Sequence, residues 1–279
     1  MVNLVAMQLC SVPDVSANLS VIEQQLSTLS RDEQHLVVLP ECCLFFGGKD
    51  AEQLSLAQNT FLQTESMSSL AVSLSALARK YNVYLVAGSM PILTENKDKF
   101  TNSSCVFSPQ GEQLARYDKI HLFDVNVDDN EKNYRESNYT QAGKQAILAK
   151  TSFANVGLSI CYDLRFPELY RYLRGQGADI ITVPSAFTQV TGNAHWQALL
   201  QARAIENQVY IIAAAQQGVH ENGRETWGHS LIISPWGEIL TSLATGVGLI
   251  NAKYSPEKLA KVRSSMPVFE HNQFKVNLK

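Results

Sequence analysis

Cys161 stands at the end of an apolar run, Val156-Gly-Leu-Ser-Ile160, and residues typical of a helix start follow it at once. A sharp turn between a buried strand and a helix lifts one side chain out of the sheet, and backbone N–H groups at the turn can receive negative charge. A thiol held there can attack the carbon of a carbonyl or a nitrile. Because the free pKa of cysteine is about 8.5, such a site also needs a base and donors for the oxyanion.

Two charged residues occupy positions where they could supply these functions. Glu41 directly follows the apolar run Val37-Val-Leu-Pro40, and Lys119 follows a strand-like segment, Glu112–Asp118. Ligand sites of α/β sheets gather at the carboxyl ends of strands, so we expect Glu41, Lys119 and Cys161 to converge. Charges at strand ends are commonly solvated, and a lone cysteine is commonly structural, so spacing alone makes this only a hypothesis.

The elements that must position these residues alternate between apolar runs and amphipathic stretches. Strands are predicted at Val2–Met7, His35–Leu39, Val83–Gly88, Val156–Ile160, Asp179–Val183 and Val209–Ala215, with hairpins over 104–117 and 229–241. Helices are predicted from Asn18, as the N-cap residue, to Leu29, and over 66–81, 168–174 and 194–207. The pattern predicts a layered α/β fold in one domain, residues 1–279. Residues 120–143 are polar and aperiodic, and we expect a functional or mobile loop there.

Composition excludes several classes of function. The net charge of −3 gives no support for a nucleic-acid or anionic-membrane surface. No apolar run approaches the roughly 18 residues of a membrane-spanning helix, and the first residues are interpreted as a strand and not as a signal peptide. The five cysteines lack the CxxC spacing of a zinc site. We therefore expect a cytoplasmic protein without a metal or another cofactor.

Three sequence motifs, in this order, resemble the carbon–nitrogen hydrolase (nitrilase-like) superfamily. They are Leu39-Pro-Glu41, Tyr117-Asp-Lys-Ile-His-Leu-Phe123 and Ile160-Cys-Tyr-Asp-Leu-Arg-Phe-Pro-Glu168. The segments Ser185–Trp196 and Gln201–Asn207 extend the resemblance over nearly the whole chain. It implies a four-layer αββα sandwich that forms a homodimer or a higher homo-oligomer.

The resemblance also implies a role for each matching residue. Cys161 would be the nucleophile, Glu41 the general base and Lys119 the cation that stabilises the tetrahedral intermediate. Glu136, in Arg135-Glu-Ser-Asn-Tyr-Thr-Gln-Ala-Gly143, matches the family's second glutamate, which holds the lysine and positions the substrate. The backbone N–H of Tyr162 would be a second oxyanion donor. Cys42 and Cys43 are alternative nucleophiles without a comparable turn, and we interpret both as packing residues.

Within the superfamily, the sequence motifs around Cys161 and Thr191 are most similar to those of the deaminated-glutathione amidase branch. That branch cleaves the 2-oxo form of glutathione to 2-oxoglutarate and cysteinylglycine through a thioester. Such a small anionic amide favours a fixed guanidinium, for which Arg165 is our hypothesis, with an ion pair to Glu168 as its alternative. Thr191 and Phe187 are further substrate-binding candidates.

Other functions stay open at this point. An omega-amidase acting on 2-oxoglutaramate uses the same chemistry, and carbamoyl-amine hydrolysis is a third possibility. A protein of a different class, an inactive amidase-like binding domain, is expected to lack one of the four matching residues. The sequence lacks the motif that is usual around the cysteine of a Cys–His protease. We interpret His195 as a structural residue that could also line the pocket.

Overall fold

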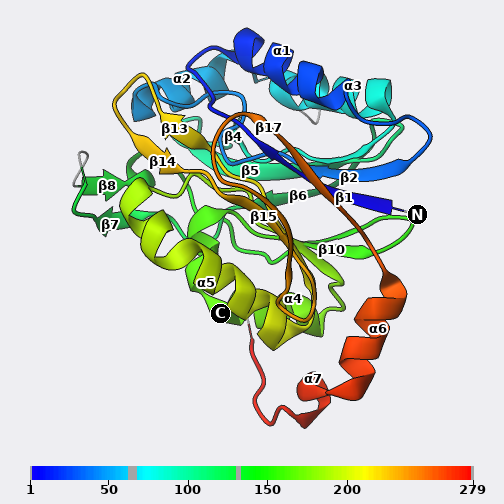
Figure 1. Cartoon of the computed structure of the whole chain (residues 1–279). Coiled ribbons are helices and arrows are strands. Elements are labelled where there is room, and N and C mark those ends of the chain that lie inside the picture. The colour runs from blue at the N-terminus through cyan, green and yellow to red at the C-terminus, as the bar shows by residue number, and fades with distance from the viewer. Residues whose placement is uncertain (1, 62–67, 130–132, 278–279) are drawn as a thin grey trace.

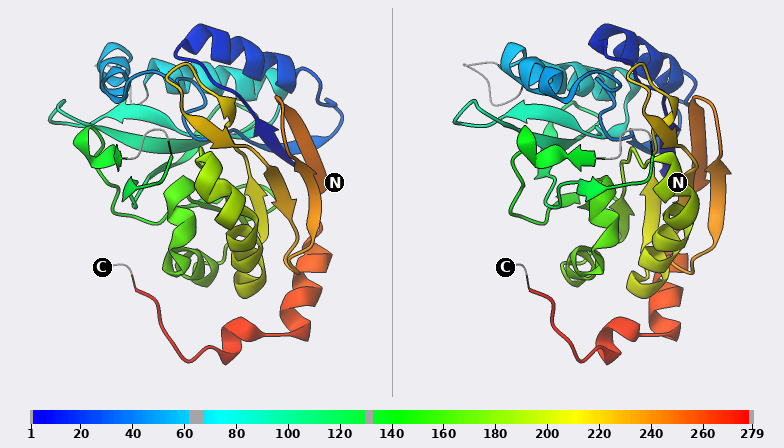
Figure 2. Two further views of the ribbon diagram at one scale, coloured as in Figure 1. Left: turned by 60° about the vertical axis from the view of Figure 1, so that its left-hand side comes forward. Right: turned by 90° about the vertical axis from the view of Figure 1, so that its left-hand side faces the viewer.

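The computed structural model describes residues 2–61, 68–129 and 133–277 (Figure 1). Two sheets lie face to face, and helices cover the outer face of each sheet (Figures 1 and 2). The described part of the chain thus forms an αββα sandwich, and the α/β fold predicted from the sequence is confirmed.

The first sheet has seven strands among the described residues, in the order β17-β1-β2-β3-β5-β4, with β6 paired to β5. They are β1 (Val2–Gln8), β2 (Gln34–Val38), β3 (Tyr84–Val86), β4 (Met90–Leu93), β5 (Phe100–Phe107), β6 (Gln113–Asp118) and β17 (Gly248–Lys253). Strands β1, β2 and β3 are parallel, with Leu4 opposite Leu36 and Leu36 opposite Tyr84. All seven residues of β1 are buried, as expected of a strand covered on both faces.

The second sheet has six strands in the described residues, in the order β16-β15-β12-β11-β10-β9. They are β9 (Leu148–Lys150), β10 (Asn155–Leu158), β11 (Ile180–Thr182), β12 (Tyr210–Ala213), β15 (Ser230–Ile233) and β16 (Ile239–Leu243). Strands β10, β11 and β12 are parallel, so their carboxyl ends lie at one edge. The predicted hairpin over 229–241 is confirmed as β15 and β16, joined by a turn in which Gly237 N–H donates to Ser234 O at 2.9 Å.

The alternation of side chains along β1 explains the layers. Val5 and Met7 belong to an apolar cluster with α1 (Val15–Leu26) and α3 (Ser69–Tyr81). Val2, Leu4 and Ala6 point the other way, into a cluster shared with the second sheet. That cluster extends to the helices α4 (Pro167–Gly175) and α5 (Gln189–Asn207), which cover the second sheet. Successive side chains of a strand face opposite sides, so one strand contributes to both cores.

Two predicted helix starts are wrong. The N-cap of α1 is Asp14, whose carboxylate accepts from Ala17 N at 3.0 Å, and not Asn18. Asn18 is buried inside the helix, where its side chain bonds the backbone of Val12 and Leu44. Aspartate and asparagine are both good N-cap residues, and here Asp14, four residues earlier, occupies the N-cap position.

Helix α5 begins at Gln189 and not near Ala194, because Thr188 caps it by accepting from Thr191 N. For α3, the predicted positions 66 and 67 lie outside the described residues, and the helix as described begins at Ser69 after the capping Ser68.

The segment 120–143, predicted to be an irregular loop, holds regular structure. Strands β7 (Asp124–Asn126) and β8 (Asn133–Arg135) pair antiparallel, and the short 3-10 helix η1 (Glu136–Asn138) follows. These elements are too short to show periodicity in the sequence. Other elements that the sequence did not indicate are α2 (Asp50–Asn59), α6 (Pro256–Ser265), α7 (Val268–His271), β13 (Gln217–Val219) and β14 (Glu225–Trp227), besides β4, β9 and β17.

Candidate active site

Cys161 begins the 3-10 helix η2 (Cys161–Arg165), just beyond the carboxyl end of β10. Its φ of +47° lies in the left-handed region, which non-glycine residues rarely adopt outside functional turns. The backbone N–H of Cys161 donates to Pro184 O at 2.8 Å, which ties the turn to the segment after β11. The side chain is buried but reaches the wall of a pocket. The sharp turn predicted from the sequence is therefore present.

The carboxylate of Asp163 holds this turn from behind. Asp163 has no exposed surface, and its Oδ2 accepts from Ile160 N at 2.8 Å and from Tyr117 Oη at 2.7 Å. Its Oδ1 accepts from the backbone N–H of His121 at 3.2 Å and lies 2.7 Å from His121 Nδ1. A carboxylate with this many donors is strongly held, so Asp163 ties the backbone just before Cys161 to the segment that follows Lys119.

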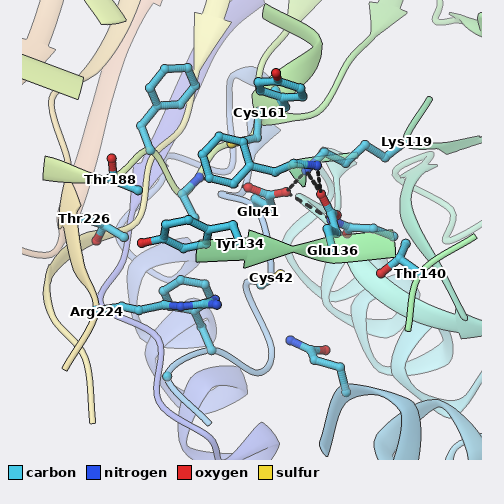
Figure 3. A pocket seen from close by; sticks show the side chains of 18 of the residues that line it. Glu41, Cys42, Lys119, Tyr134, Glu136, Thr140, Cys161, Thr188, Arg224 and Thr226 are labelled. Carbon is cyan, nitrogen blue, oxygen red and sulfur yellow. Dashed lines mark hydrogen bonds and ion pairs between the residues drawn. The ribbon is translucent and has the colours of Figure 1, made fainter. Parts of the chain in front are cut away.

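A buried ammonium group bridges the two glutamates of the predicted site (Figure 3). Lys119 Nζ lies 2.9 Å from Glu41 Oε1 and 2.9 Å from Glu136 Oε2. Lys119 is only 2% exposed and Glu41 only 5%. Glu41 follows β2, Lys119 follows β6, and Glu136 opens η1, so the cluster joins the first sheet to the segment 120–143.

Each carboxylate also receives donors that the sequence did not indicate. Asn102, on β5, donates through Nδ2 to Glu41 Oε1 at 3.0 Å and to Glu136 Oε1 at 3.3 Å. The backbone N–H of Ala186 donates to Glu41 Oε2 at 3.0 Å, and that of Phe123 donates to Glu136 Oε2 at 2.7 Å. With each oxygen held, the two carboxylates cannot rotate freely, which preserves the orientation of the cluster.

Burial and charge shift the pKa values of two groups. Burial alone would lower the pKa of Lys119, but the carboxylates of Glu136 and Glu41 outweigh it and hold that pKa well above its usual value. Burial, followed by the charge of Glu41, raises the pKa of Cys161 well above its usual value. At neutral pH the site therefore contains an ammonium group and a protonated thiol.

The four residues Glu41, Lys119, Glu136 and Cys161 line one pocket. The other predicted site residues, Tyr162, Arg165, Phe187 and Thr191, line the same pocket. The structure thus brings the whole predicted set together, while the role of each residue stays a prediction. The pocket wall also contains residues that the sequence did not mark, among them Asn102, Tyr134, Arg224 and Thr226.

Arg165 is held at the pocket wall by two rings and a histidine. Its guanidinium carbon lies 5.9 Å from the ring centroid of Tyr162 and 5.4 Å from that of Phe187. Its Nη1 lies 3.3 Å from Nδ1 of His195, which is exposed and does not line the pocket. Within the part of the chain that the structure describes, Arg165 forms no ion pair with Glu168. Glu168, the ion-pair partner that the sequence suggested as an alternative, therefore does not balance the charge of Arg165.

The neighbouring cysteines differ from each other. Cys43 is buried in the core against α1 and α3, and burial raises its pKa to about 12. Cys42 lines the pocket instead, with a φ of +52°. Burial, and then the charge of Glu41, raises the pKa of Cys42 well above its usual value. The core position of Cys43 agrees with the expected packing role, whereas Cys42 lies at the pocket wall and its role stays a prediction.

The described residues contain no group of three or more His, Cys, Asp or Glu side chains placed to hold a metal ion. None of their helices combines the length and apolar character needed to span a membrane.

Comparison with known proteins agrees with this geometry. The carbon–nitrogen hydrolase family matches residues 4–264 of the chain. Deaminated glutathione amidase of Yersinia enterocolitica is 43% identical over 273 residues, which cover 98% of this chain and 93% of that protein. The Synechocystis protein of the same name is 44% identical over 272 residues, which cover 96% of this chain and 97% of the relative.

Solved structures show the same fold. The crystal structure of the Caenorhabditis elegans NitFhit protein superposes with a TM-score of 0.88 at 33% identity, over 99% of this chain and 67% of that one. Saccharomyces cerevisiae Nit3, described as a member of branch 10 of the nitrilase superfamily, gives a TM-score of 0.83 at 30% identity, over 98% and 97% of the two chains.

An αββα sandwich that gathers a thiol, two carboxylates and an ammonium group in one pocket defines a hydrolase of the nitrilase-like class. The chain belongs to the carbon–nitrogen hydrolase family. It is therefore an enzyme that hydrolyses carbon–nitrogen bonds other than peptide bonds.

Proposed function

We propose that the chain is a cysteine-dependent amidase that cleaves deaminated glutathione to 2-oxoglutarate and cysteinylglycine. The observation that carries the chemistry is the position of Lys119 Nζ 2.9 Å from Glu41 Oε1 in the pocket that Cys161 also lines. Base, nucleophile and cation stand in one buried cluster. The substrate is supported by the relatives of this name at 43% and 44% identity.

In the proposed first step, Glu41 takes the proton of the Cys161 thiol while the sulfur bonds to the amide carbon. The negative charge moves to the amide oxygen, which the Lys119 ammonium and the backbone N–H of Tyr162 stabilise. Glu41 then gives its proton to the amide nitrogen, the carbon–nitrogen bond breaks, and cysteinylglycine leaves. The acyl group remains on Cys161 as a thioester.

In the second step, Glu41 takes a proton from a water molecule whose oxygen attacks the thioester carbon. The carbon–sulfur bond breaks, 2-oxoglutarate leaves, and the thiol regains the proton. Glu136 keeps part of the Lys119 charge away from Glu41, since both carboxylates lie 2.9 Å from the same Nζ.

Arg165 is the proposed partner of the oxo-acid carboxylate, with Phe187 and Thr191 beside it in the pocket wall. A guanidinium binds a carboxylate through two parallel hydrogen bonds, which an ammonium cannot reproduce. Arg165→Lys is therefore expected to lower kcat/KM for the oxo-acid amide roughly tenfold or more. An unchanged kcat/KM would show that this assignment is wrong.

The substrate is tested by comparing kcat/KM for deaminated glutathione, 2-oxoglutaramate and a carbamoyl amine on one enzyme preparation. The proposal expects the highest value for deaminated glutathione. A higher value for 2-oxoglutaramate would identify an omega-amidase instead. Cys161→Ala is expected to lose all turnover while its circular dichroism spectrum stays unchanged. If the protein were an inactive binding domain, the wild type itself would show no turnover.

We also propose that residues 1–279 form one cytoplasmic carbon–nitrogen hydrolase domain that assembles as a homodimer. Three large apolar side chains around one surface groove support an interface between copies: Ile205, Trp236 and Met266 are 53%, 58% and 46% exposed. The cysteines at positions 10, 42, 43, 105 and 161 are all free, which is compatible with a reducing compartment. Light scattering of the purified protein tests the dimer, since a monomer mass would contradict it.

A further inference from the structure

The backbone around Glu41 is held by two buried side chains. Residues 41–43 follow β2 and belong to neither a helix nor a strand, so their peptide groups need partners from elsewhere in the chain. Glu41 O accepts from Gln216 Nε2 at 3.0 Å, and Cys43 O accepts from Ser11 Oγ at 3.0 Å. The proposed base is therefore held through its backbone as well as through its carboxylate.

The carboxamide of Gln216 is locked in one orientation. Its Nε2 donates to Glu41 O and also to Ser11 Oγ at 2.8 Å, while its Oε1 accepts from the backbone N–H of Ser11 at 3.0 Å. A carbonyl oxygen can only accept and a backbone N–H can only donate, so these partners fix which end of the amide faces Glu41. Gln216 and Ser11 are both buried.

The backbone of Gln216 reaches the carboxylate of the same glutamate. Gln216 N donates to Ser185 O at 2.8 Å, and the next residue, Ala186, donates its N–H to Glu41 Oε2 at 3.0 Å. Gln216 lies between β12 of the second sheet and β13, whereas Glu41 follows β2 of the first sheet. One residue thus connects the second sheet to both ends of Glu41.

We propose that Gln216 is a positioning residue for Glu41, which fixes where the carboxylate lies relative to Lys119 and Cys161. The inference rests on the proposed function, in which Glu41 moves a proton both when the thioester forms and when water cleaves it. Among the described residues, those that line the pocket include Glu41 and Ala186 but neither Gln216 nor Ser11. Gln216 therefore acts through Glu41 and does not touch the substrate.

This role separates kcat from KM. A misplacement of a reacting group by about 1 Å can lower a rate about 10²-fold. Because Glu41 acts in both steps, a displaced carboxylate slows both steps together, while the groups of the pocket wall that bind the substrate stay in place. Loss of the Gln216 side chain should therefore lower kcat and leave KM nearly unchanged.

The chain offers a matched control for Gln216→Met. Gln8, on β1, is also fully buried: its Nε2 donates to Gly246 O at 3.0 Å, and its Oε1 accepts from the N–H and the hydroxyl of Ser230, each at 2.9 Å. Each replacement thus removes three hydrogen bonds of a buried amide. Neither Gln8 nor its two partners line the pocket, so Gln8→Met tests the loss of stability alone.

The experiment measures urea denaturation, kcat and KM, with whichever of deaminated glutathione, 2-oxoglutaramate and a carbamoyl amine the wild type cleaves fastest. Both glutamine replacements should lower the urea midpoint by similar amounts. We expect Gln216→Met to lower kcat about 30- to 100-fold with KM within about threefold of the wild type, and Gln8→Met to keep kcat within about threefold. Ser11→Ala, which keeps the bond from Gln216 to Glu41, should lower kcat only about 3- to 10-fold.

The outcomes separate the two proposals. If the wild type cleaves an amide and Gln216→Met and Gln8→Met have the same kcat, or if Gln216→Met changes KM alone, the positioning role is wrong and the amidase function stands. If the wild type cleaves none of the three amides, the proposed function is wrong and the positioning role falls with it. If Gln216→Met fails to fold by circular dichroism, Ser11→Ala decides, since a kcat equal to that of the wild type would refute the role.

Discussion

Replacing Asp163 by asparagine tests whether a buried carboxylate holds the turn of Cys161. Two backbone donors reach this carboxylate, Ile160 N–H at Oδ2 and His121 N–H at Oδ1. An amide has only one oxygen, so in either orientation its NH2 group faces one of these two N–H groups. Neither backbone donor can turn away, because each is fixed by the chain.

The expected loss of stability follows from that clash. A buried donor left without an acceptor costs about 1–3 kcal/mol, and the bonds that remain lose the strength given by a charged acceptor. We expect Asp163→Asn to lower the free energy of unfolding by about 2–4 kcal/mol, which is about a 30- to 1,000-fold change in the folding equilibrium. Turnover should fall as well, because Cys161 keeps its left-handed φ of +47° only while the surrounding backbone is fixed.

Urea denaturation followed by circular dichroism measures this change, with kcat/KM determined on the same preparation. Asp98→Asn is the matched control. Because Asp98 is exposed, this replacement should change the free energy of unfolding by less than about 0.5 kcal/mol. Tyr117→Phe removes only the 2.7 Å bond from Tyr117 Oη and should cost less than Asp163→Asn. If Asp163→Asn matched the wild type in both stability and activity, the reasoning would be refuted.

Two further predictions concern the reacting groups. Lys119→Met should lower kcat about 10²- to 10³-fold, because it removes a donor to the oxyanion. The control Lys80→Met changes a surface lysine and should leave kcat unchanged. Steady-state kinetics measures both variants, and equal kcat values would contradict the oxyanion role of Lys119. Because burial and Glu41 raise the pKa of Cys161, its alkylation by neutral iodoacetamide in the free enzyme should still be accelerating as the pH passes 9.0. Peptide mapping follows that labelling, and a plateau reached below this pH would argue against the raised pKa.

The part of the site that the sequence predicted is the part that follows strands. Glu41 and Cys161 come after apolar runs, so their positions follow from where buried strands end. Lys119 also follows a predicted strand, whereas Glu136 needed the family resemblance, because a glutamate in a polar segment carries no signal of its own. The layered fold was predictable for the same reason, since buried parallel strands produce continuous apolar runs.

The residues that sequence reasoning missed come from segments without such a signal. Asn102 lies in β5, whose run Thr101–Ser104 is polar yet entirely buried, and only the fold shows that both faces of this strand are covered. Arg224 lies in a turn that reaches the pocket because the short strands β13 and β14 pair with each other. Asn18 was a wrong cap because Asp14 precedes it by four residues and fills that position.

The central claim is that Cys161 carries the acyl group of the substrate, and an acid-quenched turnover mixture tests it most directly. Peptide mass spectrometry of the wild type should find the mass of a 2-oxoglutaryl group on the peptide that contains Cys161. Cys161→Ala should give no adduct and no turnover, whereas Cys42→Ala should keep the adduct although Cys42 lines the same pocket. An acyl group on Cys42, or turnover that persists in Cys161→Ala, would contradict the account.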